Sequence, residues 1–240
     1  MKCLYLYGTS SAVIGHDLAS KQLSLVNGSK VYYYNGTTLI QNPNEPLLGS
    51  GSTGSSPLRY FADSLAGLNG HDIGFSKISA TGVSWHDGLK FWSAAAVTAT
   101  KASIQPLLAD GWLVKGIIAA IDGEFDSVAE INSFARREKL VMDIWRQQLA
   151  VPQVFLLQTE NLPCKNQSSD TKKRLTLYRQ VQAKIRTTDP KTTVILSNPT
   201  WPNLPNSSLH LNVAGMYLEG QAMATTVHNW NVANPGAFGG

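Results

Sequence analysis

A serine and a histidine lie near opposite ends of this chain, each beside a segment that predicts regular structure. Ser10 follows the short apolar run Lys2–Tyr7, and His210 precedes the amphipathic stretch Asn212–Thr226. Serine oxygen is a poor nucleophile until a neighbouring base takes its proton, and histidine is the usual base. A cleft that held both side chains would carry out acyl transfer. The two residues therefore form a candidate nucleophile–base pair.

Apolar runs typical of buried strands alternate with helical patterns along the chain. The strand-like runs are Lys2–Tyr7, Ile73–Ala80, Val114–Ile121, Gln153–Thr159 and Thr193–Ser197. The helical patterns are Pro57–Leu68, Phe91–Leu108, Glu130–Leu149, Asp170–Thr187 and Asn212–Thr226. Such alternation predicts a parallel sheet with helices on both faces. We therefore predict a three-layer, flavodoxin-like α/β fold with a parallel five-stranded sheet.

One segment interrupts this alternation. Lys30–Tyr34 and Thr37–Ile40, joined by Asn35-Gly36, predict an inserted β-hairpin with a type I′ turn. We expect a single domain over residues 1–228. The Gly- and Asn-rich segment 229–240 is expected to form a loosely held tail.

The polar residues with chemical potential follow the predicted strands. Ser10 follows the first strand, Gly82 and Ser84 the second, Asp122–Asp126 the third, and His210 the fifth. In an open parallel sheet, ligands bind beyond the carboxyl ends of the strands. We therefore expect these residues to meet at one edge of the sheet.

These segments together resemble the SGNH hydrolase superfamily, and within it the sialate O-acetylesterase and acetylxylan-esterase-like branch. The family's blocks are Gly-Gln-Ser-Asn, a Gly-rich approach to a helix, Gly-Gly-Thr-Ser before Trp, Gln-Gly-Glu-Ser-Asp, and Asp-x-x-His-Leu-Asn-x-x-Gly. The similar segments here are Gly8–Ser11, Gly49–Ala62, Thr81–Trp85, Asp122–Asp126 and Ser207–Gly215. They cover nearly the whole chain in the family's order, and the resemblance implies the family's three-layer α/β fold.

The resemblance implies that Ser10 is the nucleophile and His210 the base. The backbone N–H groups of Ser10 and Gly82 would then form the oxyanion hole. Three positions depart from the family pattern: its oxyanion Asn is Ser11 here, its Gln is Asp122, and its triad Asp is Ser207. The Ser11 hydroxyl can still donate a hydrogen bond, whereas Ser207 supplies no charge to support an imidazolium.

Asp122 has several possible roles. An ionised carboxylate beside an oxyanion would oppose the transition state. Either Asp122 stays protonated in an apolar setting and donates a hydrogen bond, or Asp122, Glu124 or Asp126 turns towards His210 and replaces the missing acid. A Ser–His dyad is a third arrangement, because losing the acid weakens a triad without removing its other contributions.

The predicted activity is removal of an O-acetyl or similar short acyl group from a carbohydrate, and this substrate class comes from the resemblance alone. Trp85, His86, Trp201 and Asp126 are candidate substrate contacts, because an aromatic face beside polar groups suits a sugar ring. The chemistry needs no cofactor, and the adjacent His–Asp pairs lack the spacing of metal ligands. We therefore predict neither a cofactor nor a metal.

The composition excludes several other classes. The net charge of +4 comes from dispersed basic residues, and no nucleic-acid-binding motif is present. No apolar stretch is long enough to insert into a membrane, and the first residues do not have the form of a signal peptide. We expect a cytoplasmic protein or a part of a virion or surface assembly.

Two further functions compete with the esterase. The three altered positions favour an inactive SGNH-like module that binds a glycan, as in a cell-surface or viral adhesion assembly. A purely structural module would instead bury Ser10 under a closed cleft.

Overall fold

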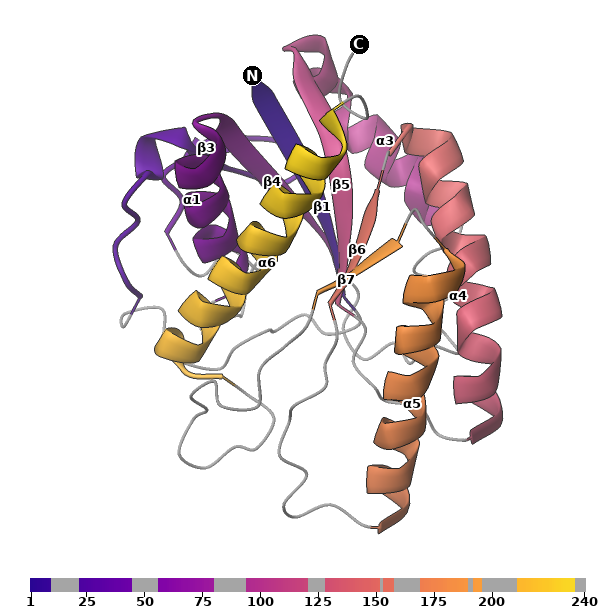
Figure 1. Cartoon of the computed structure of the whole chain (residues 1–240). Helices are drawn as coiled ribbons and strands as arrows, with labels where there is room; N and C mark the ends of the chain where they lie inside the picture. The colour runs from indigo at the N-terminus through magenta and orange to yellow at the C-terminus, as the bar shows by residue number, and fades with distance from the viewer. Residues whose placement is uncertain are drawn as a thin grey trace.

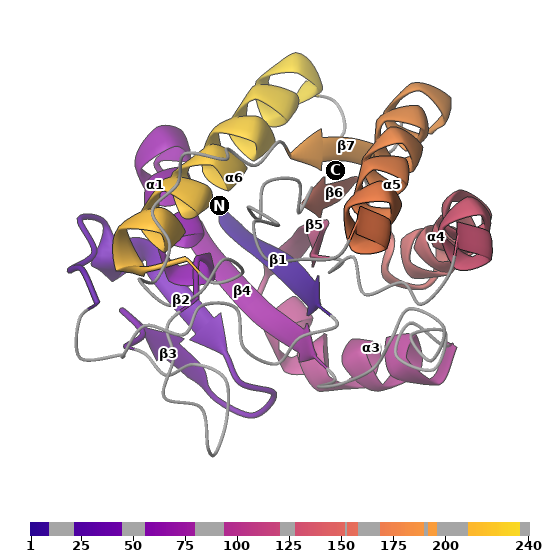
Figure 2. The same cartoon turned by 90° about the horizontal axis from the view of Figure 1, so that it is seen from below.

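The computed structural model describes residues 1–9, 22–44, 56–79, 94–120, 128–151, 153–157, 169–189, 192–195 and 211–235. These residues form a sheet with helices on both faces (Figures 1 and 2). The five predicted strands are present as β1 Lys2–Thr9, β4 Asp72–Ser79, β5 Trp112–Ala120, β6 Val154–Leu157 and β7 Thr192–Ile195. They run parallel in the order β4-β1-β5-β6-β7, which confirms the predicted fold class.

The predicted hairpin is present and extends this sheet. β2 (Val31–Tyr34) pairs in parallel with β4, and β3 (Leu39–Gln41) pairs antiparallel with β2. In the described residues the sheet therefore has seven strands, in the order β3-β2-β4-β1-β5-β6-β7. The hairpin forms one edge of the sheet, with β3 outermost.

The predicted type I′ turn is wrong. The register leaves a four-residue connection, residues 35–38, between the two strands. A type I′ turn needs positive φ at two successive residues, and in this connection only Gly36 has one, at 101°. The longer loop forms because the Asn35 side chain replaces the missing turn bonds: its Oδ1 accepts hydrogen bonds from the backbone N–H groups of Thr37 and Thr38.

The helices form a layer on each face of the sheet (Figure 2). One layer contains α1 (Leu58–Asn69) and α6 (Val213–Ala233), which pack on each other. The other contains α3 (Ala94–Ala109), α4 (Val128–Leu149) and α5 (Ser169–Thr188). A short 3-10 helix, η2 (Gly28–Lys30), precedes β2.

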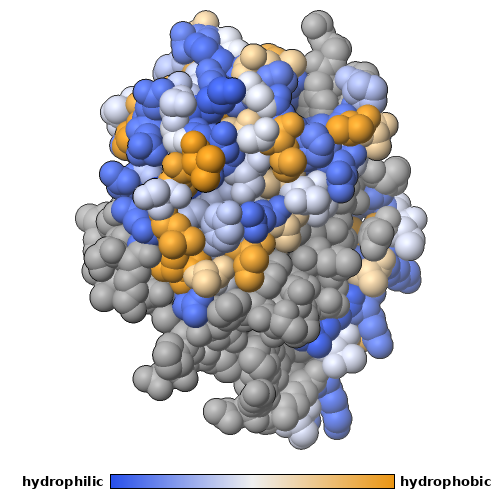
Figure 3. Space-filling model, turned by 60° about the vertical axis from the view of Figure 1, so that its left-hand side comes forward, coloured by the Kyte–Doolittle hydropathy of each residue, from blue (hydrophilic) through white to orange (hydrophobic). Residues whose placement is uncertain are grey.

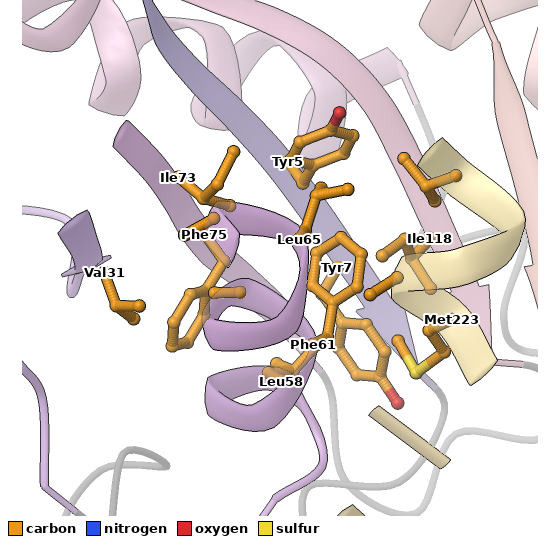
Figure 4. Close-up of a cluster of buried hydrophobic side chains, with 14 of the residues drawn as sticks. Tyr5, Tyr7, Val31, Leu58, Phe61, Leu65, Ile73, Phe75, Ile118 and Met223 are labelled. Carbon is orange, nitrogen blue, oxygen red and sulfur yellow. The ribbon is translucent and has the colours of Figure 1, made fainter. Parts of the chain in front are cut away.

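Alternating side chains of β1 build the two cores. Tyr5 and Tyr7 face the layer of α1 and α6, where Tyr5 packs edge-on against Phe61 with ring centroids 5.4 Å apart (Figure 4). Leu4 and Leu6 belong to the core under the other layer. Buried residues of that second core include Val97, Ile104, Trp112, Ile131, Met142, Trp145 and Ile185. The central strand is thus covered on both faces.

The boundary predicted for the loosely held tail is wrong. α6 continues to Ala233, so residues 229–233 are helical. Trp230 packs against the α1-side core, and Asn231 Nδ2 lies 3.4 Å from the Tyr5 hydroxyl. These contacts extend the helix because Trp230 packs on the hydrophobic core and Asn231 forms a hydrogen bond with a side chain of β1.

A charged side chain is buried where β5 departs from regular pairing with β1. Leu4 pairs with Val114 and Tyr5 with Gly116, so the register skips Lys115. The Lys115 residue is only 5% exposed. Its pKa is lowered by burial, an effect that the nearby Cys3 thiol partly offsets. The native state therefore penalises the protonated amine.

Replacing Lys115 with methionine is expected to raise the free energy of unfolding at neutral pH. Because the folded pKa lies below the ordinary value of 10.5, the unfolded chain binds more protons between those two values, and stability rises with pH across that window. Lys115→Met should remove the contribution of this side chain to the rise of the free energy of unfolding with pH. Urea unfolding at a series of pH values from about 7 up to the ordinary lysine pKa of 10.5 measures this contribution, with the exposed Lys101→Met as control. An unchanged pH dependence would contradict the assignment.

None of the helices in the described residues is long and apolar enough to cross a bilayer. On the side of the molecule drawn in Figure 3, the described hydrophobic residues form separate spots among hydrophilic ones. Scattered exposed apolar residues of this kind are ordinary in folded proteins.

Candidate active site

The carboxyl ends of the five parallel strands are aligned at one edge of the sheet. Thr9, the last residue of β1, pairs with Ser79 of β4 and with Ala120 of β5. Ala120 in turn pairs with Leu157 of β6, and Leu157 with Ile195 of β7. Each of these residues is the last of its strand. The chain segments that leave the three central strands therefore start side by side.

The predicted site residues continue from these ends, but they lie outside the described residues. They are Ser10, Ser11, Gly82, Trp85, His86, Asp122, Glu124, Asp126, Trp201 and His210. Ser207, the position of the family's triad acid, also lies outside. Ser10 comes one residue after β1, Gly82 three after β4 and Asp122 two after β5. The positions of their side chains stay predictions.

The chain on the other side of His210 is fixed to the start of α6. Leu211 packs against a small cluster that contains Tyr60, Val213 and Met216. Asn212 caps the helix, because its side-chain oxygen accepts a hydrogen bond from the Gly215 N–H at 2.9 Å. The backbone that leads to His210 therefore starts from a capped and packed helix end.

The described segment that begins at Gln22 is held along α1 by side-chain hydrogen bonds. The backbone N–H groups of Val26 and Asn27 donate to the two carboxylate oxygens of Asp63, at 3.2 and 2.6 Å. The Leu23 N–H donates to the Tyr60 hydroxyl at 3.0 Å. An extended segment needs partners for its backbone groups, and here helix side chains supply them. Residues 23, 26 and 27 are thus held against α1 by these hydrogen bonds.

Two buried charged residues near this edge were not singled out by the sequence analysis. Arg59, in the first turn of α1, is 2% exposed, donates to the Gln22 side chain and stacks over the Tyr60 ring. Glu219 of α6 is 7% exposed. A weak sequence signal exists for Arg59, because it borders the apolar face of its helix. Its side chain contacts Gln22, which is 37 residues away in the chain, and a helical pattern does not reveal such a contact.

Among the described residues, several groups with shifted pKa values lie at the amino ends of the strands. The pKa values of Cys3 and Lys115 are shifted mainly by burial, upwards for the thiol and downwards for the amine. His71 has a lowered pKa, first through desolvation and then through nearby positive charges. These groups lie at the amino ends of the strands. The carboxyl edge instead receives the N-terminus of α6 and, because each helix after a strand begins there, the positive ends of the helix dipoles.

The described residues contain no group of three or more His, Cys, Asp or Glu side chains that could hold a metal ion. The cysteine among them, Cys3, is buried and is not in a disulfide. The predicted absence of a metal and of a cofactor stays a prediction.

Comparison with known proteins gives structural matches. No family model and no curated protein sequence matches this chain. A protein from Arabidopsis thaliana superposes with a TM-score of 0.75 at 13% identity, over 94% of this chain and 97% of that protein. The protein NanS superposes with a TM-score of 0.66 at 10% identity, over 96% of this chain and 98% of NanS.

A carbohydrate acetylesterase from Xanthomonas citri also matches, with a TM-score of 0.63 at 15% identity. The match covers 99% of this chain but 56% of that enzyme, so this chain spans little more than half its length. At such low identity the superpositions establish the architecture. The chain therefore shares a three-layer α/β fold with these proteins.

Proposed function

We propose that this protein is a serine esterase that removes O-acetyl or similar short acyl groups from a carbohydrate. The observation that carries the proposal is the alignment of Thr9, Ser79 and Ala120. Because these three residues end neighbouring strands, the segments that contain Ser10, Gly82 and Asp122 begin at neighbouring strand ends. The fold shared with a carbohydrate acetylesterase supports the same reaction class.

In the proposed reaction, Ser10 Oγ attacks the acyl carbon while His210 accepts its proton. The carbonyl oxygen becomes negatively charged, and the backbone N–H groups of Ser10 and Gly82 stabilise it, with the Ser11 hydroxyl as a further donor. The bond to the sugar oxygen then breaks, and His210 returns its proton to that oxygen. Water activated by His210 attacks the acyl-enzyme, which releases the carboxylic acid and restores Ser10.

The proposed substrate contacts surround this centre. Trp85 and Trp201 would present aromatic faces to a sugar ring, with His86 and Asp126 as polar partners. The acid behind His210 is Asp122 or Glu124, or the pair works as a dyad. Without a conventional acid, we expect a slower enzyme than a full triad gives, because the acid orients the imidazole and stabilises its charge.

Labelling with a fluorophosphonate tests the proposal. The reagent forms a covalent bond only with an activated serine, so we expect one adduct, located on Ser10 by peptide mass spectrometry and absent from Ser10→Ala. A second candidate function is glycan binding without catalysis, favoured by the substitutions at Ser11, Asp122 and Ser207. An unlabelled wild-type protein that binds acetylated glycans on an array would establish this second function and reject the first.

A further inference from the structure

The chain contains three Asn-Gly pairs, Asn27-Gly28, Asn35-Gly36 and Asn69-Gly70. Such a pair can react with itself. The glycine backbone nitrogen attacks the asparagine side-chain amide carbon and loses its proton to solvent base, and a C–N bond forms. The bond to Nδ2 then breaks, and the departing nitrogen takes a proton from solvent and leaves as ammonia. Water then opens the cyclic imide to aspartate or isoaspartate. Glycine favours the attack because it has no side chain to hinder the turn.

Asn35 and Gly36 occupy the exposed loop between β2 and β3. Asn35 Oδ1 accepts three hydrogen bonds, from Thr37 N–H at 3.0 Å, Thr37 Oγ1 at 3.0 Å and Thr38 N–H at 2.8 Å. Attack on the amide carbon places negative charge on this oxygen. Donors already directed at the oxygen stabilise that charge, as they do in an oxyanion hole.

The nucleophile and the leaving group of this pair are both unrestrained. Among the described residues, the Gly36 N–H and the Asn35 Nδ2 make no hydrogen bond. Gly36 has a φ of 101°, and a Cβ built on it would meet no atom within 4 Å. The loop therefore has room for the ring, and no bond has to break before the attack begins.

The other two pairs are restrained. The Gly70 N–H donates to the Ala66 carbonyl at 2.9 Å, and Asn69 Oδ1 lies 2.6 Å from His228 Nδ1. Asn27 Nδ2 donates to the Asp63 carbonyl at 3.1 Å. Gly28 is buried, and a Cβ there would lie 2.4 Å from Asn42 Oδ1. The Gly70 N–H bond holds the nucleophile of one pair and the Asn27 Nδ2 bond holds the leaving group of the other, so each bond has to be lost before that ring can close.

We infer that Asn35-Gly36 is a self-modification site, at which the folded protein converts Asn35 to aspartate and isoaspartate with release of ammonia while the other two pairs stay intact. The isoaspartyl product adds one carbon atom to the main chain at the base of the loop. It would displace the Gly36 carbonyl, which accepts a hydrogen bond from the buried Tyr34 hydroxyl at 3.0 Å. The modification would therefore disturb a hydrogen bond of the β2–β3 hairpin, which forms one edge of the sheet.

Peptide mapping of the full chain tests the inference. Trypsin cleaves after Lys21, Lys30, Arg59 and Lys77, so the three pairs fall on three separate peptides. The native protein is incubated at mildly alkaline pH, and each peptide is followed for the mass increase of about 1 Da that replacement of an amide by a carboxyl group produces. We expect the Asn35 peptide to convert at least about fivefold faster than the Asn69 and Asn27 peptides, since each of those must lose a hydrogen bond worth ~1 kcal/mol.

Three comparisons decide the result. In denaturant the three peptides should convert at similar rates, because the protection of Asn27 and Asn69 is lost. Asn35→Gln should abolish the conversion of its peptide, since glutamine must close a larger ring. Thr37→Val should slow it severalfold by removing one donor to Asn35 Oδ1. Equal rates for the three pairs in the native protein would overturn the inference, and an unchanged rate in Thr37→Val would overturn the role given to the donors.

Discussion

Ser10→Ala is expected to lower kcat/KM for ester hydrolysis by about a thousandfold or more, the size of loss seen when a catalytic serine is removed. The proposed function requires this result, because alanine cannot form the acyl-enzyme. Hydrolysis of p-nitrophenyl acetate and of an acetylated sugar measures it, with circular dichroism as a check on folding. Activity that survives unchanged in the variant would reject Ser10 as the nucleophile.

Two matched serine variants separate catalysis from a general effect of substitution. Ser11→Ala removes only a hydroxyl donor to the proposed oxyanion, so kcat should fall by about ten- to a hundredfold with little change in KM. Ser24 is exposed in the segment along α1, and Ser24→Ala should behave as wild type. A loss in Ser24→Ala as large as that in Ser10→Ala would point to damage of the fold.

Gly220→Ala is expected to destabilise the protein by about 2–3 kcal/mol, through overpacking where α6 crosses α1. A Cβ at Gly220 would lie 2.7 Å from the Phe61 backbone nitrogen and 2.8 Å from the Pro57 carbonyl oxygen. These are backbone atoms of α1 and of its N-cap residue, so the helices themselves must separate. Thermal unfolding should show a Tm lower by about 4–10 °C.

Gly67→Ala provides the control within the same pair of helices. The nearest atom to its added Cβ is Asn27 Nδ2, the end of a side chain, at 2.9 Å. The improved helix propensity of alanine offsets this contact, so the free energy of unfolding should stay within about 1 kcal/mol of wild type. If both variants lose stability equally, the close crossing at Gly220 is not the cause.

Hydrophobic periodicity predicts the elements of this fold well, because buried strands and amphipathic helices leave strong patterns. β1, for example, was expected over Lys2–Tyr7 and is observed over Lys2–Thr9. The errors fall where side chains override the pattern. Asn35 bonds the loop backbone and so replaces the expected two-residue turn. Asn231 and Trp230 find partners on the sheet and so extend α6 beyond its predicted end.

The candidate site is only partly predictable from the sequence. The resemblance to the family's blocks identifies Ser10 and His210 as candidates, and their positions after predicted strands lead to the prediction that they meet at one edge. The alignment of Thr9 with both Ser79 and Ala120 depends on strand register, which local sequence does not specify. The burial of Arg59 likewise depends on Gln22, which is 37 residues away in the chain. Long-range pairing of this kind leaves no periodic signal.

The position of β1 at the centre of the sheet has a consequence for biosynthesis. This strand is made before the other strands of the sheet, yet its neighbour β5 ends at Ala120, and the helix that closes the core of Tyr5 and Phe61 begins at Val213. A nascent chain therefore carries an uncovered apolar sheet face until α6 has left the ribosome. Such a chain depends on late, long-range closure, and its incomplete forms are prone to aggregate.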